Sequence, residues 1–341
     1  MRLLVIRTSS MGDVALVTPV LMEMRKKFPE ADIIMLTRPA FKSFFSEDDH
    51  LTVFSPDFKN RHKGLKGIFK LYRDLKSKYR FDHIIDIHDV LRSKILRFLF
   101  RIAGTPVSVI DKGRIDKRDL ISGKKKVQLK HSVIRYCETF NRAGFHLEPS
   151  DKQSIVPKLT EDRLDQLFSI KRDLNIGIAP YALHKLKMWP EENMICLIKL
   201  ISEKYSPGFF LFGGKEDAMQ LKGIKEKIPG VINPEGTLSL EEELAVMSRL
   251  DFMIAMDSSN MHMASLVGTK VISIWGGTDP LTGFGAWMQP DEYSIRIPVE
   301  ELTCRPCTIY GKGECRRGDL ACMNWLTPEL VFERIVNLKM I

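Results

Sequence analysis

A carboxylate stands near the start of the chain, where an apolar strand gives way to polar residues. The stretch "SSMGDV" follows "RLLVIRT" and places Ser10, Gly12 and Asp13 at the turn into a helix. Ser10 suits the cap of that helix, and an acidic residue three positions later resembles a capping box, although Glu or Gln is usual there. Gly12 lets a ligand approach the backbone closely. Asp13 is therefore either part of a helix cap or a side chain presented to a substrate.

A second polar cluster lies in the other half of the chain, in "AMDSSNMHMASLVGTKVISIWGGTDP". An apolar strand delivers Asp257, and Ser258, Ser259 and Asn260 follow at the expected start of a helix. Small hydroxyl groups and free backbone amides at a helix start suit a diphosphate. His262 falls on the first turn and could face the same ligand, although a single histidine on such a helix is more often structural.

Two neighbouring loops offer further polar groups after apolar strands. Lys187 lies in "YALHKLKMWP", and Glu216 lies in "FGGKED". A lysine can bind phosphate, and a carboxylate can accept hydrogen bonds from two ribose hydroxyls. Each loop alone carries little weight, because surface lysines are usually just solvated. Together, polar loops at the carboxyl ends of parallel strands predict a nucleotide site.

The carboxyl-terminal part contains four cysteines with the spacing C-x2-C-x7-C-x6-C, namely Cys304, Cys307, Cys315 and Cys322. Four thiols could hold a structural zinc ion tetrahedrally, and disulfides are disfavoured in the cytosol. Free or redox-labile thiols are the favoured interpretation. A catalytic zinc is not expected, because no open histidine-rich site accompanies the cysteines.

The elements that must position these groups alternate between strand and helix patterns. In the first half, apolar runs such as "LLVI", "ADIIML" and "HIIDI" alternate with segments of helical spacing, and the pattern restarts near residue 174. This alternation predicts an α/β protein with two doubly wound parallel units in series. Pro19 falls inside a helical stretch and must either kink it or occupy a first turn. The polar stretch 145–172 is the predicted linker, which gives domains 1–155 and 156–341; the terminal helix could pack back on the first domain.

Charge is unevenly distributed along the 341 residues. The net charge is +9, but residues 1–163 carry 33 Lys and Arg against 20 Asp and Glu, whereas residues 164–341 carry 19 against 23. A basic half predicts an anionic partner, which could be nucleic acid, anionic lipid or a phosphorylated substrate; the alternative is a merely solvated surface.

Several classes of protein are disfavoured by absent patterns. The sequence lacks a phosphate loop of the type G-x-x-x-x-G-K-[ST] and a G-x-G-x-x-G dinucleotide fingerprint. It also lacks a run of about 20 apolar residues and the apolar core of a signal peptide. We therefore expect a cytoplasmic protein without a dinucleotide cofactor.

At this point the residues resemble a known family. "RTSSMGDVALVTPVL", "KMWPEENMICLI", the segment around Asp257 and the cysteine-containing tail match, in that order, glycosyltransferase family 9, the ADP-heptose:lipopolysaccharide heptosyltransferases. The resemblance implies a GT-B fold, with two Rossmann-like domains facing a central cleft. It implies an inverting glycosyltransferase that needs no metal or other cofactor. The donor would be a nucleotide sugar, with ADP-heptose favoured, and the acceptor a lipopolysaccharide core or related glycan.

The family motif also implies roles for individual residues. Asp13 would be the catalytic base, Lys187 would hold the donor phosphates, and Glu216 would contact the nucleoside. Asp257 would contact the sugar. The remaining donor-binding residues would be Ser258, Ser259, Asn260 and His262. Ser259 stands where the family often has Gly, and Asn260 where it often has an apolar residue, which leaves the donor sugar open.

The basic half would then bind the acceptor. Besides Ser10, the candidates for contacts to its anionic groups are Lys59, Arg61, Lys63, Arg114 and Lys117. The same residues would favour peripheral contact with the anionic inner face of the cytoplasmic membrane. Nucleic acid is not an expected partner, because neither interleaved aromatic and basic residues nor a recognition helix is evident. The alternatives are a family member that uses another nucleotide sugar and a non-enzymatic anion- or nucleic-acid-binding protein.

Overall fold

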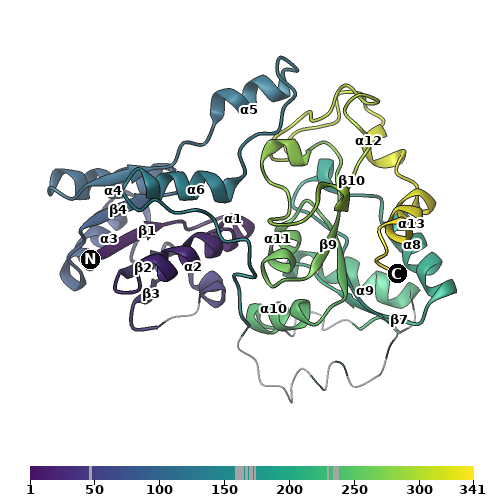
Figure 1. Cartoon of the computed structure of the whole chain (residues 1–341), viewed down its shortest axis with the longest axis horizontal. Helices are drawn as coiled ribbons and strands as arrows, with labels where there is room; N and C mark the ends of the chain where they lie inside the picture. Colours follow the sequence, from purple (N-terminus) through teal and green to yellow (C-terminus); the bar gives the residue numbers. More distant parts are fainter. Residues whose placement is uncertain are drawn as a thin grey trace. The chain divides into compact units, whose positions relative to one another are not determined.

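The computed structural model describes residues 1–45, 48–157, 165, 168, 172, 174–228, 230–232 and 238–341. The chain forms two compact units (Figure 1). Unit 1 comprises Met1–Lys112 and Ser132–Ile155, and unit 2 comprises Gly113–His131 and Val156–Ile341. The predicted division placed residues 113–131 with the first domain, whereas here they pack with the second. Their partners explain the difference: the amide of Leu129 donates to the carbonyl of Leu281, and Lys126 Nζ donates to that of Thr303.

The sheet of unit 1 is parallel, with the strand order β3-β2-β1-β4-β5. Its strands are β1 (Arg2–Ile6), β2 (Asp32–Leu36), β3 (Leu51–Phe54), β4 (His83–Asp86) and β5 (Val107–Val109). The central β1 is buried along almost its whole length, as expected when helices cover both faces of a parallel sheet. The strand reading of the first half is confirmed.

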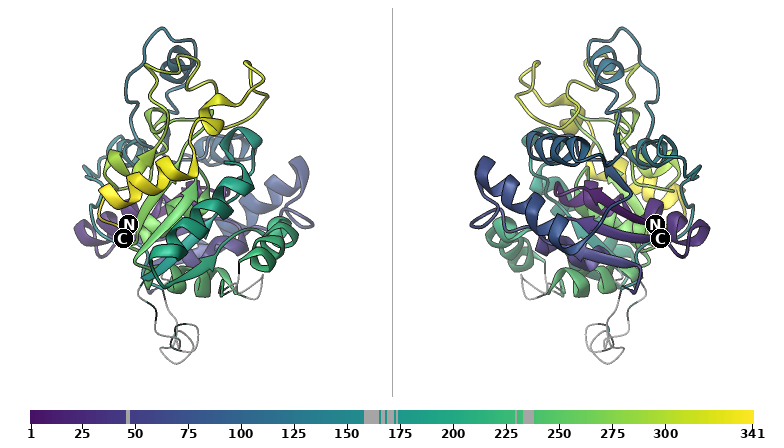
Figure 2. Two further views of the ribbon diagram at one scale, coloured as in Figure 1. Left: turned by 90° about the vertical axis from the view of Figure 1, so that its right-hand side faces the viewer. Right: turned by 90° about the vertical axis from the view of Figure 1, so that its left-hand side faces the viewer.

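Helices cover both faces of this sheet (Figure 2). The helical elements are α1 (Met11–Ala15), α2 (Thr18–Lys27), η1 (Pro39–Phe44), α3 (Gly64–Lys78), α4 (Leu91–Ile102) and α6 (Ser132–Asn141). The helical stretch around Pro19 is broken between α1 and α2, and Pro19 lies in the first turn of α2. Because the β1–β2 and β3–β4 crossovers run in opposite directions along the sheet, right-handed connections place α2 and α3 on opposite faces. On one face, α3 and α4 pack together and bury Ile68, Leu71 and Phe100.

Unit 2 repeats the plan with a second parallel sheet, ordered β10-β9-β8-β6-β7. Its strands are β6 (Leu174–Ala179), β7 (Pro207–Leu211), β8 (Phe252–Met256), β9 (Lys270–Ile274) and β10 (Ser294–Ile295). The central β8 is buried at every position. The two parallel sheets with crossover helices confirm the predicted pair of doubly wound units.

The helical elements of unit 2 begin with the segment that comes from the first half of the chain. They are α5 (Arg114–Ile121), η2 (Lys185–Lys187), α8 (Glu191–Lys204), η3 (Lys215–Asp217), α9 (Ala218–Lys227), α10 (Leu240–Ser248), α11 (Ser259–Leu266), η4 (Pro280–Thr282), η5 (Asp291–Tyr293), α12 (Ala321–Asn324) and α13 (Pro328–Asn337). The terminal α13 packs against α8 and contributes Val331, Phe332 and Ile335 to the core of unit 2.

The parallel strands bring the polar loops of each unit to one edge. In unit 1, the segments after β1 and β4 leave the sheet side by side, because Ile6 and Asp86 are paired neighbours at the strand ends. In unit 2, Ala179 of β6 is paired with Ala255 of β8, and Met256 with Ile274 of β9. Among the described residues, no helix has the length and apolar character needed to cross a bilayer.

Candidate functional site

Asp13 lies on the first turn of α1, directly after the carboxyl end of β1. Ser10 occupies the N-cap position, as predicted. The hydroxyl of Ser10 donates to Oδ2 of Asp13 at 2.6 Å, and the amide of Ser10 lies 3.3 Å from the same oxygen. Asp13 thus takes part in capping the helix on which it lies, as the cap interpretation expects. That role does not exclude the other, because its side chain keeps 24% of its accessible surface.

Arg7 is the principal charged partner of Asp13. Its Nη2 lies 2.7 Å from Oδ2 of Asp13, its Nη1 donates to the carbonyl of Ile87 at 2.8 Å, and its guanidinium lies 5.7 Å from the ring centroid of Tyr136. Burial acts to lower the pKa of Arg7, but the charge of Asp13, the hydrogen bond to Asp13 and the neighbouring Tyr136 and Asp86 together outweigh it, and the net shift is upward. Tyr136 in turn donates to the backbone carbonyl of Asp13 at 3.2 Å. Arg7 therefore holds the carboxylate of Asp13 in place.

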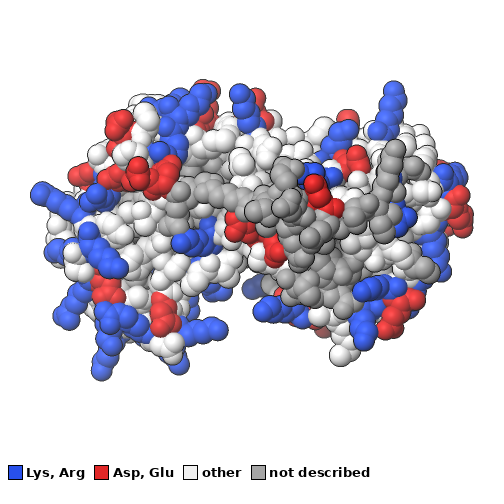
Figure 3. Space-filling view, turned by 90° about the horizontal axis from the view of Figure 1, so that it is seen from below, with Lys and Arg blue, Asp and Glu red and all other residues white. Residues whose placement is uncertain are grey.

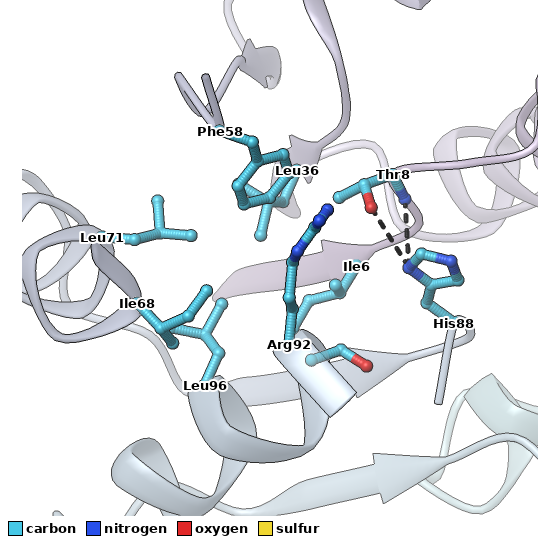
Figure 4. A pocket seen from close by; sticks show the side chains of 10 residues that line it. Ile6, Thr8, Leu36, Phe58, Ile68, Leu71, His88, Arg92 and Leu96 are labelled. Atoms are coloured by element: carbon cyan, nitrogen blue, oxygen red, sulfur yellow. Dashed lines mark hydrogen bonds between the residues drawn. The ribbon is translucent and has the colours of Figure 1, made fainter. Parts of the chain in front are cut away.

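His88 supports the loop that leads to Asp13. Its ring nitrogens lie 3.2 Å from the hydroxyl of Thr8 and 3.4 Å from that of Ser9. Burial, with help from the charge of Arg7, lowers the pKa of His88 to about 3, so the ring is neutral at physiological pH. Figure 4 shows His88 beside Thr8 at the mouth of a small apolar pocket, together with Arg92 and Phe58. The pocket has room for about one water molecule, which is too little for a sugar.

The five predicted acceptor-binding cations are divided between the units. Lys59, Arg61 and Lys63 lie in the exposed loop between β3 and α3 of unit 1, and Arg61 is held by Asp74 through hydrogen bonds of 2.6 and 2.7 Å. Arg114 and Lys117 lie on α5 in unit 2, so the expectation that the whole basic half belongs to one domain is wrong.

Lys117 has aromatic neighbours in unit 2. Its Nζ lies 4.4 Å from the ring centroid of Phe284 and 5.6 Å from that of Tyr310. A lysine over aromatic rings is stabilised by cation–π attraction. These contacts explain why α5 is part of unit 2 despite its position in the sequence.

In unit 2, an ion pair joins two of the predicted donor-binding residues. Lys187 Nζ lies 2.8 Å from Oδ2 of Asp257, and the hydroxyl of Thr278 donates to the same oxygen at 2.7 Å. Asp257 is almost fully buried, with 5% of its side-chain surface exposed, whereas Lys187 keeps 16%. The accessible member of this pair is the cation, which is the group an anionic ligand needs.

The start of α11 lies directly after Asp257. Ser258 is the N-cap residue, and Ser259 and Asn260 begin the helix. Within the described part of the chain, the buried hydroxyl of Ser258 has no hydrogen-bond partner. A buried hydroxyl at a helix amino terminus that lacks a protein partner is suited to a ligand oxygen. His262 is buried on the first turn, as the sequence predicted, whereas Glu216 is exposed in η3 after β7.

The loop "WGGTD" after β9 is held by a buried arginine that the sequence reading did not single out. Arg305 donates to the carbonyls of Gly276 at 2.7 Å and Thr278 at 3.0 Å, and its Nη2 lies 3.2 Å from Asp279. Burial lowers the pKa of Arg305, although Asp279 opposes the shift. The amide of Cys307 donates to the carbonyl of Gly277 at 3.0 Å. The C-x-x-C segment thus holds this loop in place through hydrogen bonds from Arg305 and Cys307.

The arrangement of the cysteines does not support the structural-zinc alternative. All six cysteines are unpaired thiols, and among the described residues no three His, Cys, Asp or Glu side chains are placed to hold a metal ion. Burial raises the pKa of Cys307, and it raises that of Cys322 to about 11, so both thiols stay protonated.

A separate cavity of about 410 Å³ lies along β10, and none of the predicted donor-binding residues lines it.

Sequence reasoning missed Arg7, Tyr136, His88, Thr278 and Arg305. Arg7 stands two residues before the quoted "SSMGDV", and Thr278 lies inside a loop that was noted only for its glycines. A buried arginine is rare unless it is paired, so an arginine at the end of an apolar strand is a usable signal. Tyr136 and His88 are distant in sequence from Asp13, and their contribution depends on the fold.

Two parallel α/β units in one chain are the architecture of glycosyltransferases with the GT-B fold, and solved structures of that kind resemble this one. A glycosyl transferase family 9 structure from Veillonella parvula DSM 2008 superposes with a TM-score of 0.76 at 19% identity, covering 99% of this chain and 96% of that chain. The Escherichia coli heptosyltransferase WaaC, solved with ADP, gives a TM-score of 0.63 at 19% identity, covering 90% of this chain and 97% of that chain.

The sequence comparisons agree with the fold. Lipopolysaccharide heptosyltransferase 1 of Escherichia coli O18:K1:H7 is 23% identical over 320 residues, which is 89% of this chain and 94% of that protein. The model of glycosyltransferase family 9 (heptosyltransferase) matches residues 68–308. The protein belongs to glycosyltransferase family 9, and it is a glycosyltransferase of the heptosyltransferase type.

Proposed function

We propose that this protein transfers a heptose from ADP-heptose onto a lipopolysaccharide core or a related glycan, with inversion at the anomeric carbon and without a metal ion. The observation that carries the proposal is the contrast between two ion pairs. In the pair of Arg7 and Asp13 the carboxylate is the more exposed partner, at 24% against 9%. In the pair of Lys187 and Asp257 the lysine is the more exposed, at 16% against 5%. One pair therefore offers a base and the other a cation.

In the proposed reaction, an acceptor hydroxyl attacks the anomeric carbon as Asp13 takes its proton. A glycosidic bond forms, the bond between that carbon and the diphosphate oxygen breaks, and the nucleoside diphosphate leaves with the electron pair. Attack from the face opposite the leaving group inverts the configuration. A positioned base typically contributes about 10²- to 10⁴-fold in rate.

The donor side supplies the charge that the departing diphosphate needs. Lys187 offers a cation, and the amino terminus of α11 offers backbone amides and the hydroxyl of Ser258. Preorganised donors of this kind stabilise developing negative charge without a metal. Glu216, exposed after β7, is proposed to contact the ribose, and Asn260 and Ser259 to face the sugar. The proposal further places the protein in the cytoplasm, with Lys59 and Lys63 near the anionic groups of the acceptor.

The decisive experiment combines purified protein, ADP-heptose and a detergent-dispersed lipopolysaccharide-type acceptor, and detects the product by mass spectrometry. We expect transfer that persists in a chelator and a product whose anomeric configuration, read by NMR, is opposite to that of the donor. Thermal shift with ADP, UDP and GDP tests the nucleotide, and we expect ADP to stabilise the protein most. Transfer from another nucleotide sugar alone would reassign the donor. No stabilisation by any of the three nucleotides, together with no transfer, would favour a non-enzymatic anion-binding protein.

A further inference from the structure

Two neighbouring helices of unit 1, α3 and α4, carry an outer face that the proposed chemistry does not use. Both pack on one side of the sheet and bury Leu71, Leu75 and Leu96 against it. The right-hand view of Figure 2 looks at the side of unit 1 on which they lie. A helix of this kind normally presents polar residues to water, whereas α4 presents apolar residues to water as well as basic ones.

The outer face of α4 carries large apolar residues between its basic ones. Leu91, Phe98 and Ile102 are 71%, 58% and 69% exposed, and their spacing of seven and then four residues places them on one stripe. On α3, Leu65 and Phe69 are 64% and 50% exposed. Single exposed apolar residues need no explanation, but a group on adjacent helices marks an interaction site. These five residues, with the exposed basic residues around them, are the α3–α4 surface.

Basic side chains surround this apolar group. The helices α3 and α4 together contain nine Lys and Arg and one acidic residue, Asp74. Asp74 is neutralised by Arg61 at 2.6 Å and lies 2.9 Å from His62. Lys78, the last residue of α3, is also exposed and is not counted in the surface; its basic members are Lys66, Lys70, Arg73, Lys76, Arg92, Lys94 and Arg101. Figure 3 shows Lys and Arg side chains projecting around the outer rim of this unit, at the left.

The combination of exposed apolar and basic side chains indicates one class of partner. Exposed leucine, phenylalanine and isoleucine surrounded by lysine and arginine are the features of helices that lie in the interface of an anionic membrane. Each basic residue near such a surface contributes about 1 kcal/mol of attraction. A second protein would need acidic residues in register with seven cations, whereas an anionic bilayer presents negative charge everywhere along its plane. Charge and apolarity therefore both fit a lipid surface.

The α3–α4 surface lies beside the edge that carries Asp13. Helix α4 begins five residues after β4 ends, at the same edge of the sheet as the end of β1. The small pocket at that edge is lined by residues of both helices, including Ile68, Arg92 and Leu96 (Figure 4). The start of α4, with Leu91, therefore lies at the edge that carries the candidate base, and Phe98 and Ile102 lie farther along the same helix. This matters because the proposed acceptor is a membrane lipid.

We propose that the α3–α4 surface docks unit 1 on an anionic phospholipid bilayer, with Leu91, Phe98 and Ile102 inserted between headgroups and the surrounding lysines and arginines held by lipid phosphates. The proposal rests on the proposed function only for the identity of the acceptor; the binding itself requires no substrate. It names the residues by which the enzyme would reach a lipid-linked acceptor.

The test is flotation of the full-length protein with vesicles that contain neither acceptor nor nucleotide sugar. Vesicles of phosphatidylcholine mixed with phosphatidylglycerol are compared with vesicles of phosphatidylcholine alone. We expect binding to the anionic vesicles, weakened by salt, and at least about a tenfold loss in the double variant Phe98→Ser, Ile102→Ser. The matched control is Met219→Ser, Val336→Ser, which replaces two exposed apolar residues of unit 2 and should bind like the unmodified protein.

Several outcomes would overturn the proposal. They are equal binding of the unmodified protein and the Phe98/Ile102 variant to anionic vesicles, equal binding to both kinds of vesicle, and no binding to either. A dimer in light scattering that becomes a monomer in the same variant, without vesicle binding, would assign the surface to a second copy of the chain. Transfer onto a detergent-dispersed acceptor should survive in the variant. Failure of transfer in every protein would contradict the proposed function and leave the vesicle result standing.

Discussion

Unit 1 and unit 2 each contain an ion pair at the edge of the sheet, but the two units expose opposite members of that pair. Each places a carboxylate just beyond a central strand, at or next to a helix start, and pairs it with a cation, at 2.7 Å for Arg7 with Asp13 and at 2.8 Å for Lys187 with Asp257. In unit 1 the arginine is the buried member, and in unit 2 the aspartate is. A buried partner acts as a support for the exposed one, so the same ion pair presents a base in one unit and a cation in the other.

The comparison is tested most severely by removing the exposed carboxylate. We expect Asp13→Asn to lower the rate of transfer by about 10³-fold, because the amide cannot accept the proton of the attacking hydroxyl. The asparagine keeps the shape of the loop and leaves Arg7 a polar partner, so the protein should stay folded. Turnover is measured by product formation, and ADP binding by calorimetry should be unchanged. Unchanged turnover would contradict the assignment of Asp13 as the base.

Removing the exposed cation is the corresponding experiment in unit 2. We expect Lys187→Met to weaken ADP binding by about 10- to 100-fold, since a charge-assisted contact to phosphate is lost. The control is Lys185→Met, which changes an exposed lysine in the same short helix and should bind ADP normally. Circular dichroism reports whether the now unpaired Asp257 unfolds the protein. Equal effects of the two substitutions would show that Lys187 has no special role.

A conservative change of the buried support gives a smaller effect. Arg7→Lys keeps the positive charge but loses the bidentate geometry that reaches both Asp13 and the carbonyl of Ile87. We expect kcat to fall about tenfold while KM for the donor changes little, because the donor is assigned to the other unit. A rise in the donor KM with kcat unchanged would sink the interpretation of Arg7 as a positioning residue.

The smallest expected effect concerns the buried His88 of unit 1 and the partly buried His131 of unit 2. Burial lowers the pKa of His88 to about 3 and that of His131 to about 4, so both are neutral in the folded protein, whereas an unfolded histidine takes up a proton near pH 6.5. Stability is therefore retained above pH 6.5 and lost as the pH falls below it, by about 1 kcal/mol for each histidine at pH 5.5.

Urea titrations at pH 7 and pH 5.5 measure this loss. Because burial raises the pKa of Glu243 to about 7, that residue acts in the opposite direction, and the informative quantity is the difference between the unmodified protein and its variants. His88→Asn and His131→Asn should each lose less stability between the two pH values than the unmodified protein does. Identical losses in all three proteins would contradict the prediction.

The sequence predicted the fold better than it predicted the supports of the site. Strict alternation of apolar runs and helical spacing defines two parallel sheets, and residues at strand ends such as Asp13 and Asp257 must then lie at the sheet edges. Arg305 could not be predicted in the same way, because its carbonyl partners lie about 30 residues earlier in the chain and meet it only through the fold. The place of Lys117 depended on Phe284 and Tyr310, which are far from it in sequence.

The cysteines illustrate the same limit. Their spacing is compatible with a metal site, but spacing does not state where side chains point. In the structure the backbone of this segment holds the loop after β9, and Arg305, between Cys304 and Cys307, makes the contacts. The residue between the two cysteines is thus more informative about the segment than the cysteines themselves.

Residues 113–131 have a consequence for how the protein is made. The polypeptide passes between the units three times, after Lys112, after His131 and after Ile155, so neither unit corresponds to one uninterrupted stretch of gene. During synthesis, these nineteen residues leave the ribosome before any strand of the unit 2 sheet. They can pack in their final place only after that sheet has been made. Exchange of one unit between relatives by recombination would require cuts at several places, and a single crossover near codon 155 would give a hybrid with a mismatched piece.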